Sequence, residues 1–431
     1  MLLRFLVALL LAIAEQALAA ECEPAVIDRL RPLHRWRSDV LTEHFYVLDE
    51  PPLPLLPIAQ LERVEGFVLP TPEPGTLALH RLRKPQARVG VYAARPEALD
   101  LLVNHLGFVD FGIEGYLFAS PGPGRVPLRA LWSAGTTDFL LTGDEEEILD
   151  ATTGGPGPGF VDLGVEGYAA PFFSIGEPSG AHEGQAPRGT MMLVHGGAWQ
   201  DEGETSAASD LNLADAARWR DRGWRTLAVS YRPSREGPAN SWPALLGAAP
   251  PVVPGSATRS IEDVTWFYDE VRRWLGPDIP VCASGWSSGG HLALLLASLR
   301  PSLDCVVAQA APTDLPALRS AGTIGGLAAE FAFGSQSTTP PADAFSPVAV
   351  VEGIQARLLL ATAENDTWVP PSQMDALRTA MAGTGKGRNI ATLRLRDGPH
   401  AFWHGTVSTA ALAELRRAED RLANEVTSAS R

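Results

Sequence analysis

The second half of the chain alternates short apolar runs with longer stretches whose apolar residues recur at helical spacing. The apolar runs predict six buried strands, at residues 191–194, 224–231, 279–285, 305–310, 357–362 and 390–395. Helices are predicted between them, for example at 261–275 and 290–298. Continuous apolar strands separated by helices indicate a mostly parallel sheet with helices on both faces. The antiparallel pair that usually opens such a sheet is not evident before Thr190.

The first half repeats itself with a period of about 50 residues. Residues 32–36 recur at 78–82 and more weakly at 127–131, and a Glu-Gly-aromatic segment recurs at 65–67, 114–116 and 166–168. Each copy is predicted to contain a strand, a turn, a second strand, a short helix and a final strand. One such unit buries little core by itself, so we expect three copies to pack into a closed, pseudo-threefold, mainly β module.

These patterns divide the chain into two predicted domains. The repeat module spans residues 23–174, and an α/β catalytic domain spans 190–431. Residues 175–189 continue a stretch rich in Gly, Pro, Ser and Ala and are predicted to be the linker between the two domains.

The N-terminal residues 1–19 are predicted to be a signal peptide. They combine a basic Arg4, an uninterrupted apolar run at 5–14 and a small-x-small pattern that ends at Ala19. Lipid attachment at Cys22 is not expected, because Glu21 stands where such a signal needs a small residue. No second apolar run reaches about 18 residues, so we expect an exported protein, secreted or periplasmic, without a membrane span.

Composition narrows the possible partners. The chain has 431 residues and a formal net charge of −15, which disfavours binding to nucleic acid or anionic lipid. Its three cysteines, Cys22, Cys282 and Cys305, do not have the spacing of a metal site. Cys282 and Cys305 lie in apolar runs and are predicted to be buried thiols, with a bridge between neighbouring strands as the less favoured alternative.

Ser287 is the predicted nucleophile of the second half. It lies in Gly285-Trp286-Ser287-Ser288-Gly289, between a predicted strand and a predicted helix. A serine in that turn is held in a strained conformation with its hydroxyl exposed above the sheet, and the two glycines let strand and helix approach closely.

A second motif follows the first strand of this half. His195-Gly196-Gly197-Ala198-Trp199 offers small residues whose backbone N–H groups can stabilise an oxyanion. The expected donors are the N–H groups of Ser288, Gly197 and Ala198, with Gly196 close behind. His195 is expected to brace this loop rather than to act as a base.

The strand, serine and helix resemble the nucleophile turn of the α/β-hydrolase fold, and this resemblance implies the chain order nucleophile, acid, histidine. His400 lies on a loop after the last predicted strand and is the favoured base, with His404 as the alternative. Asp366 follows a predicted strand directly and is the favoured acid, with Glu364 as the alternative. No metal ion or organic cofactor is implied.

The substrate site is expected to take side chains from around these positions. Trp199, Trp286 and Phe402 flank the catalytic residues and are candidates for the pocket lining, although core packing explains each of them equally well. The segment 313–347 is too long for a plain turn and is predicted to act as a small lid. Residues 233–260 are a second candidate for shaping the site.

The C-terminal motifs resemble the α/β-hydrolase family of esterases and lipases with a His-Gly-Gly oxyanion loop, over about residues 190–423. Small carboxylesterases, feruloyl-type esterases, arylformamidases and the catalytic domains of some serine peptidases are the nearest groups. Ala198 is a departure, since many members have a third glycine there.

The N-terminal copies resemble a family of secreted repeat modules of unknown function that are attached to other extracellular domains. Glu43-His44-Phe45-Tyr46 matches the family's aromatic strand, and residues 90–92 and 137–139 are its degraded counterparts. By analogy, this resemblance implies a binding or surface-attachment module.

Together the motifs predict a secreted serine carboxylic ester hydrolase that forms an acyl-enzyme on a Ser-His-Asp triad. Its expected substrate is a small-molecule or polymer-borne ester. One alternative is an amide hydrolase, similar to a peptidase or an arylformamidase, on the same triad. Another is a protein whose repeats bind a glycan or cell-surface ligand, with a secondary hydrolase. The acyl and alcohol groups of the substrate stay open.

Overall fold

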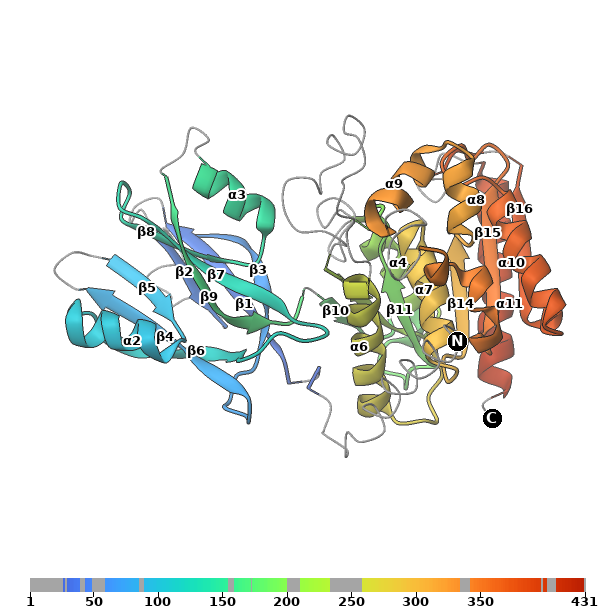
Figure 1. Ribbon diagram of the computed structural model, residues 1–431. Helices are drawn as coiled ribbons and strands as arrows, with labels where there is room; N and C mark the ends of the chain where they lie inside the picture. The colour runs from blue at the N-terminus through green and yellow to red at the C-terminus, as the bar shows by residue number, and fades with distance from the viewer. Residues whose placement is uncertain are drawn as a thin grey trace, which may run out of the picture.

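The computed structural model describes residues 26–27, 29–38, 43–48, 59–84, 89–153, 159–171, 173–199, 210–232, 258–333, 342–396, 398–400 and 408–429. The predicted signal peptide, Cys22, Phe402, His404 and most of the segment 233–260 lie outside these residues. The chain forms two lobes, the repeat module and the α/β domain (Figure 1). No helix within the described ranges combines the length and apolarity that crossing a membrane requires.

The repeat module consists of three similar three-stranded units. In each unit the first strand lies in the middle and pairs antiparallel with the other two. The strand orders are β2 (Glu43–Val47), β1 (Arg31–Ser38), β3 (Gln60–Val68); β5 (Val89–Ala93), β4 (Thr76–Lys84), β6 (Val109–Phe118); and β8 (Asp138–Thr142), β7 (Val126–Ser133), β9 (Val161–Ala169). Helix α2 (Pro96–Asp100), continued by the π-helical turn η2 (Leu101–His105), and helix α3 (Glu145–Thr153) precede the final strands of the second and third units, as predicted.

The three units close on one another at the Glu-Gly-aromatic segments. The ends of their final strands meet in three backbone pairings, Leu69 with Tyr116, Phe118 with Tyr168, and Phe67 with Ala170. Behind them, Tyr46 and Tyr92 pack edge to face with ring centroids 5.1 Å apart. The predicted closed, pseudo-threefold, mainly β module is confirmed.

Strand register corrects the alignment of the third copy. Tyr46 lies opposite Arg35, and Tyr92 lies opposite the equivalent Arg81. In the third unit the same place opposite Ala130 is held by Leu141, two residues beyond the predicted Phe139. The sequence pattern equates the aromatic residue Phe139 with Tyr46 and Tyr92, whereas the strand pairing shows that the equivalent residue is the aliphatic Leu141.

The α/β domain is built on a seven-stranded sheet. Its order is β10 (Phe173–Gly176), β12 (Arg225–Val229), β11 (Thr190–Val194), β13 (Val281–Trp286), β14 (Cys305–Gln309), β15 (Arg357–Ala363), β16 (Ile390–Leu395). The six predicted strands are all present and parallel. The additional strand β10 is antiparallel to β12. The catalytic sheet therefore begins at Phe173, and the boundary predicted at 174 with a linker at 175–189 lies too far along the chain.

Helices cover both faces of this sheet because its strands are apolar on both sides. Alternate strand residues such as Met191 and Leu193 pack with α4 (Asp210–Arg220) and α11 (Thr409–Ala429). The intervening residues, such as Met192, pack on the face of α6, α7 and α10. These helices span Thr258–Leu275, Ser288–Leu299 and Ser372–Gly383, while α8 (Leu315–Ser320) and α9 (Ile324–Phe333) lie within the predicted lid. Single 3-10 turns occur at Gly180–His182, Ala342–Phe345, Pro347–Ala349, Val351–Gly353 and Gly387–Asn389.

Cys282 and Cys305 form a disulfide between β13 and β14. The two residues are direct partners in the parallel register, and their Cα atoms lie 4.6 Å apart. The prediction of two buried thiols is therefore wrong. The apolar runs correctly placed both residues in the core, but only the strand order makes them neighbours.

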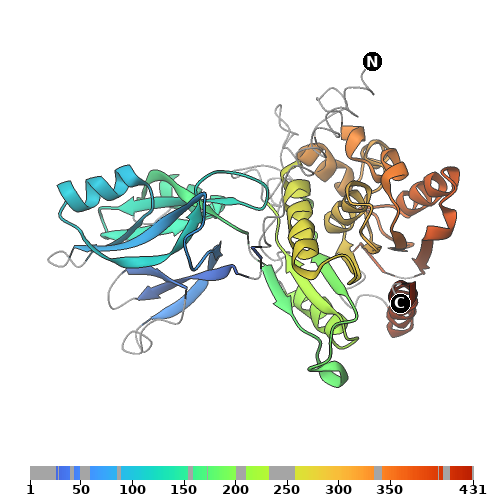
Figure 2. The same cartoon turned by 90° about the horizontal axis from the view of Figure 1, so that it is seen from below.

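The repeat module packs against α6, which faces it in both ribbon views (Figures 1 and 2). The aromatic contacts run from Phe67 to Phe173 and on to Phe267 of α6, with centroids 4.2 and 5.7 Å apart. Beside them the buried carboxylate of Asp263 accepts a hydrogen bond from the N–H of Gly124, at 2.7 Å. Glu270 of α6, which is also buried, accepts the N–H of Val26 at 2.7 Å. The two lobes thus share an apolar core and buried polar contacts.

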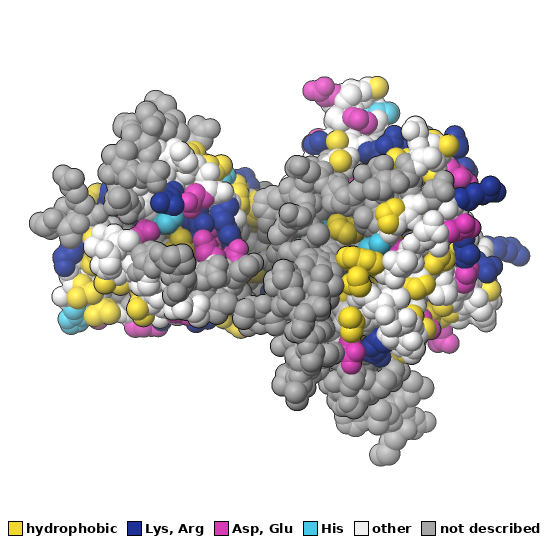
Figure 3. Space-filling view, turned by 90° about the horizontal axis from the view of Figure 1, so that it is seen from above, with side chains coloured by type: hydrophobic (Ala, Val, Ile, Leu, Met, Phe, Trp, Pro, Cys, Tyr) yellow, Lys and Arg dark blue, Asp and Glu magenta, His cyan; other side chains and the backbone are white. Residues whose placement is uncertain are grey.

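Charged side chains of both signs lie interspersed on the face seen from above (Figure 3). Across the described part of the chain many charges are paired, as in the salt bridges of Arg63 with Asp144 and of Arg222 with Asp420. On this face the net negative charge of the chain is therefore spread out and is not gathered into one acidic surface.

Candidate active site

Ser287 occupies a strained turn between β13 and α7. Its φ and ψ are 52° and −124°, in a region that a residue with a Cβ rarely adopts. The flanking glycines are required by close contacts. A Cβ on Gly289 would lie 2.1 Å from the carbonyl oxygen of Val194, and one on Gly285 would lie 2.4 Å from that of Gly289. The turn lifts the serine to the carboxyl edge of the sheet.

Three predicted side chains meet at this turn. The Nε2 atom of His400 lies 2.9 Å from Ser287 Oγ, and its Nδ1 atom lies 2.8 Å from Asp366 Oδ2. A carboxylate only accepts hydrogen bonds, so the Nδ1–H group donates to Asp366. In the neutral imidazole, Nε2 is then free to accept the hydrogen bond of the serine hydroxyl.

Asp366 is held firmly in its loop. Its Oδ1 atom accepts the backbone N–H groups of Trp368 and Val369, each at 2.9 Å, which leaves Oδ2 for His400. The carboxylate is buried, whereas the alternative Glu364 is exposed at the surface. The indole of Trp368 stacks on the imidazole of His400, with centroids 5.2 Å apart.

The loop after β11 has positive φ angles at three successive residues, which L-amino acids rarely adopt. Gly197, Ala198 and Trp199 have φ of 112°, 57° and 62°. Ala198 lines the same pocket as Ser287. Ser288 is the first residue of α7, so its N–H belongs to those that a helix leaves without an intrahelical acceptor. Ala198 and Ser288 thus lie beside Ser287, and their N–H groups remain the candidates for an oxyanion hole.

The side chains of His195 and Tyr231 hold this loop through hydrogen bonds to its carbonyl groups. The rings stack with centroids 4.2 Å apart, and the Tyr231 hydroxyl donates to the carbonyl of His195 at 3.0 Å. His195 itself donates from Nδ1 to the carbonyl of Gly196, at 2.6 Å. Burial lowers the pKa of His195 to about 4, so the ring is neutral around pH 7. This is the bracing geometry expected from the sequence.

The pocket at Ser287 is small and mostly apolar. Its lining residues are Ala198, Trp199, Ser287, Pro312, Gly325, Ala328, Trp368, Val369 and His400. Gly325 and Ala328 belong to α9, so the segment predicted as a lid contributes to the wall of this pocket. Trp286 is not part of this described lining, because its ring packs on Gly196 instead. Phe402 lies outside the described residues.

Trp199 is fixed by a histidine that the motifs did not single out. Its Nε1–H donates to Nδ1 of His291 at 3.2 Å, and the Nε2–H of His291 donates to the carbonyl of Phe345 at 2.8 Å. Burial lowers the pKa of His291 to about 4, which keeps Nδ1 available as an acceptor. The oxyanion loop is thereby tied to the segment predicted as a lid.

Several pocket residues could not be anticipated from the motifs. Trp368 and Val369 lie two and three residues after Asp366, and this proximity in the chain was the one available signal for them. Pro312, Gly325 and Ala328 come from the long connection between β14 and β15, where nothing in the sequence marks individual positions. Among the described residues, no group of His, Cys, Asp and Glu has the arrangement of a metal site.

Comparison with known families agrees with this division of the chain. Residues 180–381 match the BD-FAE family, and the C-terminal half is an esterase-like α/β hydrolase. Residues 32–170 match DUF5648, a domain of unknown function. A comparison with curated proteins gives no match.

Several solved structures are similar to the chain at low identity. A truncated carbohydrate esterase from gut microbiota has 16% identity and a TM-score of 0.44, over 58% of this chain and 90% of that one. Thermogutta terrifontis esterase 2 has 17% identity and a TM-score of 0.42, over 59% and 89%. A Pyrococcus horikoshii acylaminoacyl peptidase has 16% identity and a TM-score of 0.40, over 54% of this chain but only 36% of the peptidase.

Proposed function

We propose that this protein, an esterase-like α/β hydrolase in its C-terminal half, is an exported serine carboxylic ester hydrolase with Ser287 as nucleophile. One observation carries the proposal, the hydrogen-bond chain from Asp366 through His400 to Ser287 in a strained turn. The apolar pocket beside the serine and the family match of this half support it.

The reaction proceeds in two halves on this geometry. His400 takes the proton of Ser287 as the oxygen attacks the ester carbonyl, and Asp366 stabilises the imidazolium. The N–H groups of the Gly197–Ala198 loop and of Ser288 stabilise the oxyanion. His400 then protonates the departing alcohol, which leaves an acyl group on Ser287. Water, deprotonated by His400, then attacks this acyl-enzyme. As the carboxylic acid leaves, the imidazolium of His400 returns the proton to the Ser287 oxygen.

Replacement of the nucleophile tests the proposal. Ser287→Ala should abolish hydrolysis of p-nitrophenyl acetate by the full chain. Ser288→Ala is a matched control, because it removes the neighbouring hydroxyl and keeps the backbone N–H; we expect it to retain activity far above that of Ser287→Ala. Hydrolysis by Ser287→Ala at the wild-type rate would reject the assignment.

The same triad supports amide hydrolysis, so the bond itself needs a direct comparison. We expect an aryl ester to be turned over much faster than the anilide of the same acid, since the family match of this half is to an esterase-type family. Faster turnover of the anilide would favour the amide hydrolase instead.

Export is part of the proposal. The predicted signal at residues 1–19 and the disulfide of Cys282 with Cys305 both support it, because disulfides persist mainly in oxidising compartments. Expression with the native N-terminus should yield an exported chain that begins after Ala19 and carries this disulfide, by mass spectrometry. An uncleaved chain retained in the cytoplasm would contradict export.

A further inference from the structure

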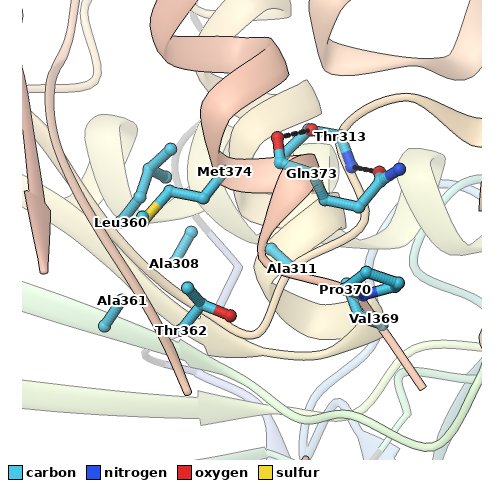
Figure 4. Close-up of a pocket in the computed structure, with 10 residues that line it drawn as sticks. All are labelled: Ala308, Ala311, Thr313, Leu360, Ala361, Thr362, Val369, Pro370, Gln373 and Met374. Atoms are coloured by element: carbon cyan, nitrogen blue, oxygen red, sulfur yellow. Dashed lines mark hydrogen bonds between the residues drawn. The ribbon is translucent and has the colours of Figure 1, made fainter. Parts of the chain in front are cut away.

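A second cavity lies behind the pocket at Ser287, near the carboxyl ends of β14 and β15 (Figure 4). Its lining residues are Ala308, Ala311, Thr313, Leu360, Ala361, Thr362, Val369, Pro370, Gln373 and Met374. We propose that this inner cavity is a latent acyl-chain subsite and that Val369, which separates it from Ser287, sets the length of the acyl group. The inference rests on the proposed function.

Two backbone segments form the partition between the cavities. Along one segment, Trp368 lines the pocket at Ser287 and Pro370 lines the inner cavity. Along the other, Pro312 faces the serine pocket, whereas its neighbours on both sides line the inner cavity. Val369 is the residue that borders both spaces, so its side chain is the part of the wall that a substitution can remove.

Val369 is also held in place through its backbone. Its backbone N–H donates to Asp366 Oδ1, and its side chain is buried. The orientation of this residue is therefore fixed by the loop that positions the triad acid. Because the tie is through the backbone, a smaller side chain at position 369 can open the wall while it keeps the hydrogen bond to Asp366.

The inner cavity combines an apolar wall with three polar side chains, and two of these, Thr313 and Gln373, are already hydrogen-bonded to each other. Three alanines line it, with Leu360 and Met374 completing the apolar wall. The Thr362 hydroxyl is buried at the same place and has no hydrogen-bond partner among the described residues (Figure 4). A cavity with a polar point can hold water, which an entering chain can displace. The small side chains leave space that bulkier core residues would have filled.

Val369 accordingly restricts the wild-type enzyme to short acyl groups. In Val369→Ala the two spaces join, and a straight acyl chain attached to Ser287 can extend inward. Each added methylene that becomes buried should raise kcat/KM about fourfold, which is the fold-change for a free energy of transfer of about 0.8 kcal/mol per methylene. The ratio of kcat/KM for p-nitrophenyl butyrate over acetate should therefore rise by about 15-fold over that of the wild type.

The test measures this butyrate-to-acetate ratio in the full chain. Met374→Phe, placed in the Val369→Ala background, fills the inner cavity and should return the ratio toward the wild-type value. Val351→Ala is the matched control, because it truncates a buried valine that borders neither cavity and should leave the ratio unchanged. If Val369→Ala does not fold, Val369→Cys makes a smaller opening and should give an intermediate ratio.

The outcomes separate the two proposals. A wild-type enzyme that hydrolyses the acetate, together with an unchanged ratio in a folded Val369→Ala or Val369→Cys, overturns the inner subsite alone. An increase that Met374→Phe does not reverse also overturns it, since the chain would then lie elsewhere. A wild-type protein that hydrolyses neither ester rejects the proposed function itself.

Discussion

Backbone strain at the level of single residues gathers at the proposed site. Five described non-glycine residues have φ between 47° and 62°, and three of them, Ala198, Trp199 and Ser287, line the pocket. Such conformations cost free energy and persist where the surroundings impose them, as the close contacts of Gly289 do here. The proposed nucleophile and the proposed oxyanion donors are therefore fixed before a substrate arrives.

Replacement of the triad acid gives a prediction at this scale. Asp366→Asn keeps the shape and the acceptor for the N–H groups of Trp368 and Val369, but its amide favours the wrong tautomer of His400. We expect kcat for p-nitrophenyl acetate to fall by about 10⁴, with the melting temperature close to that of the wild type. A fall of less than about tenfold would contradict the role of Asp366 as the orienting acid.

The sequence was most informative for the three triad residues, because the fold dictates their order along the chain. Ser287, Asp366 and His400 could be predicted because each follows a strand at the edge where parallel strands end. The role of Val369 could not, because a wall between two cavities depends on how two distant loops pack. Nothing in the pattern indicated the contact of His291 with Trp199 either.

Elements show the same contrast between local and long-range information. The six parallel strands are continuous apolar runs and were predicted, whereas β10 has only four residues and lies within the stretch 171–189, which is rich in Gly, Pro, Ser and Ala. Only its antiparallel pairing with β12 identifies it as a strand of the catalytic sheet. The disulfide was the less favoured alternative for the same reason, since β13 and β14 become neighbours only through the order of the sheet.

The disulfide between these strands should contribute to stability. Cys282 and Cys305 are 23 residues apart in sequence, and a loop of that size corresponds to about 3 kcal/mol of unfolding free energy. We expect the Cys282→Ala/Cys305→Ala variant to lose about that much in urea unfolding at pH 7. Full stability in this variant, or in the reduced wild type, would contradict the contribution.

Contacts between the repeat units should make stability depend on pH. Burial opposes the charge of His44, but Asp138 and Glu62 outweigh this effect and raise its pKa to about 9. Because the folded pKa lies above the ordinary value, the contribution is fully present below about pH 6.5 and is lost as the pH rises through 9. The shift corresponds to about 3 kcal/mol.

This pH effect is measured as a difference between two proteins. The stability advantage of the wild type over His44→Gln should shrink between pH 6.5 and 10, by chemical unfolding at each pH. A constant difference across that range would show that His44 is not stabilised as a cation by its partners in the first and third repeat units.

At the scale of the whole molecule, the two lobes are joined at Asp263. Its buried carboxylate binds the N–H of Gly124 from the repeat module and both the N–H and the guanidinium of Arg232 from the α/β domain. Sequence predicted the two domains separately but gave no information on their contact, which depends on one turn of the repeats meeting α6. The shared aromatic core predicts that the lobes unfold together.

Asp263→Ala should weaken the whole chain. It leaves the Arg232 guanidinium without its buried partner and Gly124 without its acceptor, so we expect a loss of about 3–5 kcal/mol in unfolding free energy. The adjacent Glu262→Ala is the control, since Glu262 is half exposed and should cost less than about 0.5 kcal/mol. Equal stability of the two variants would show that the contacts of Asp263 with Gly124 and Arg232 do not stabilise the chain.

Covalent labelling identifies the nucleophile most directly. The intact protein is treated with a fluorophosphonate, and the modified peptide is mapped by mass spectrometry while hydrolysis of p-nitrophenyl acetate is followed. We predict one adduct, on Ser287, that increases in proportion to the loss of activity and is absent from Ser287→Ala. An adduct on another residue that accounts for the loss, or full activity with Ser287 completely modified, would contradict the account.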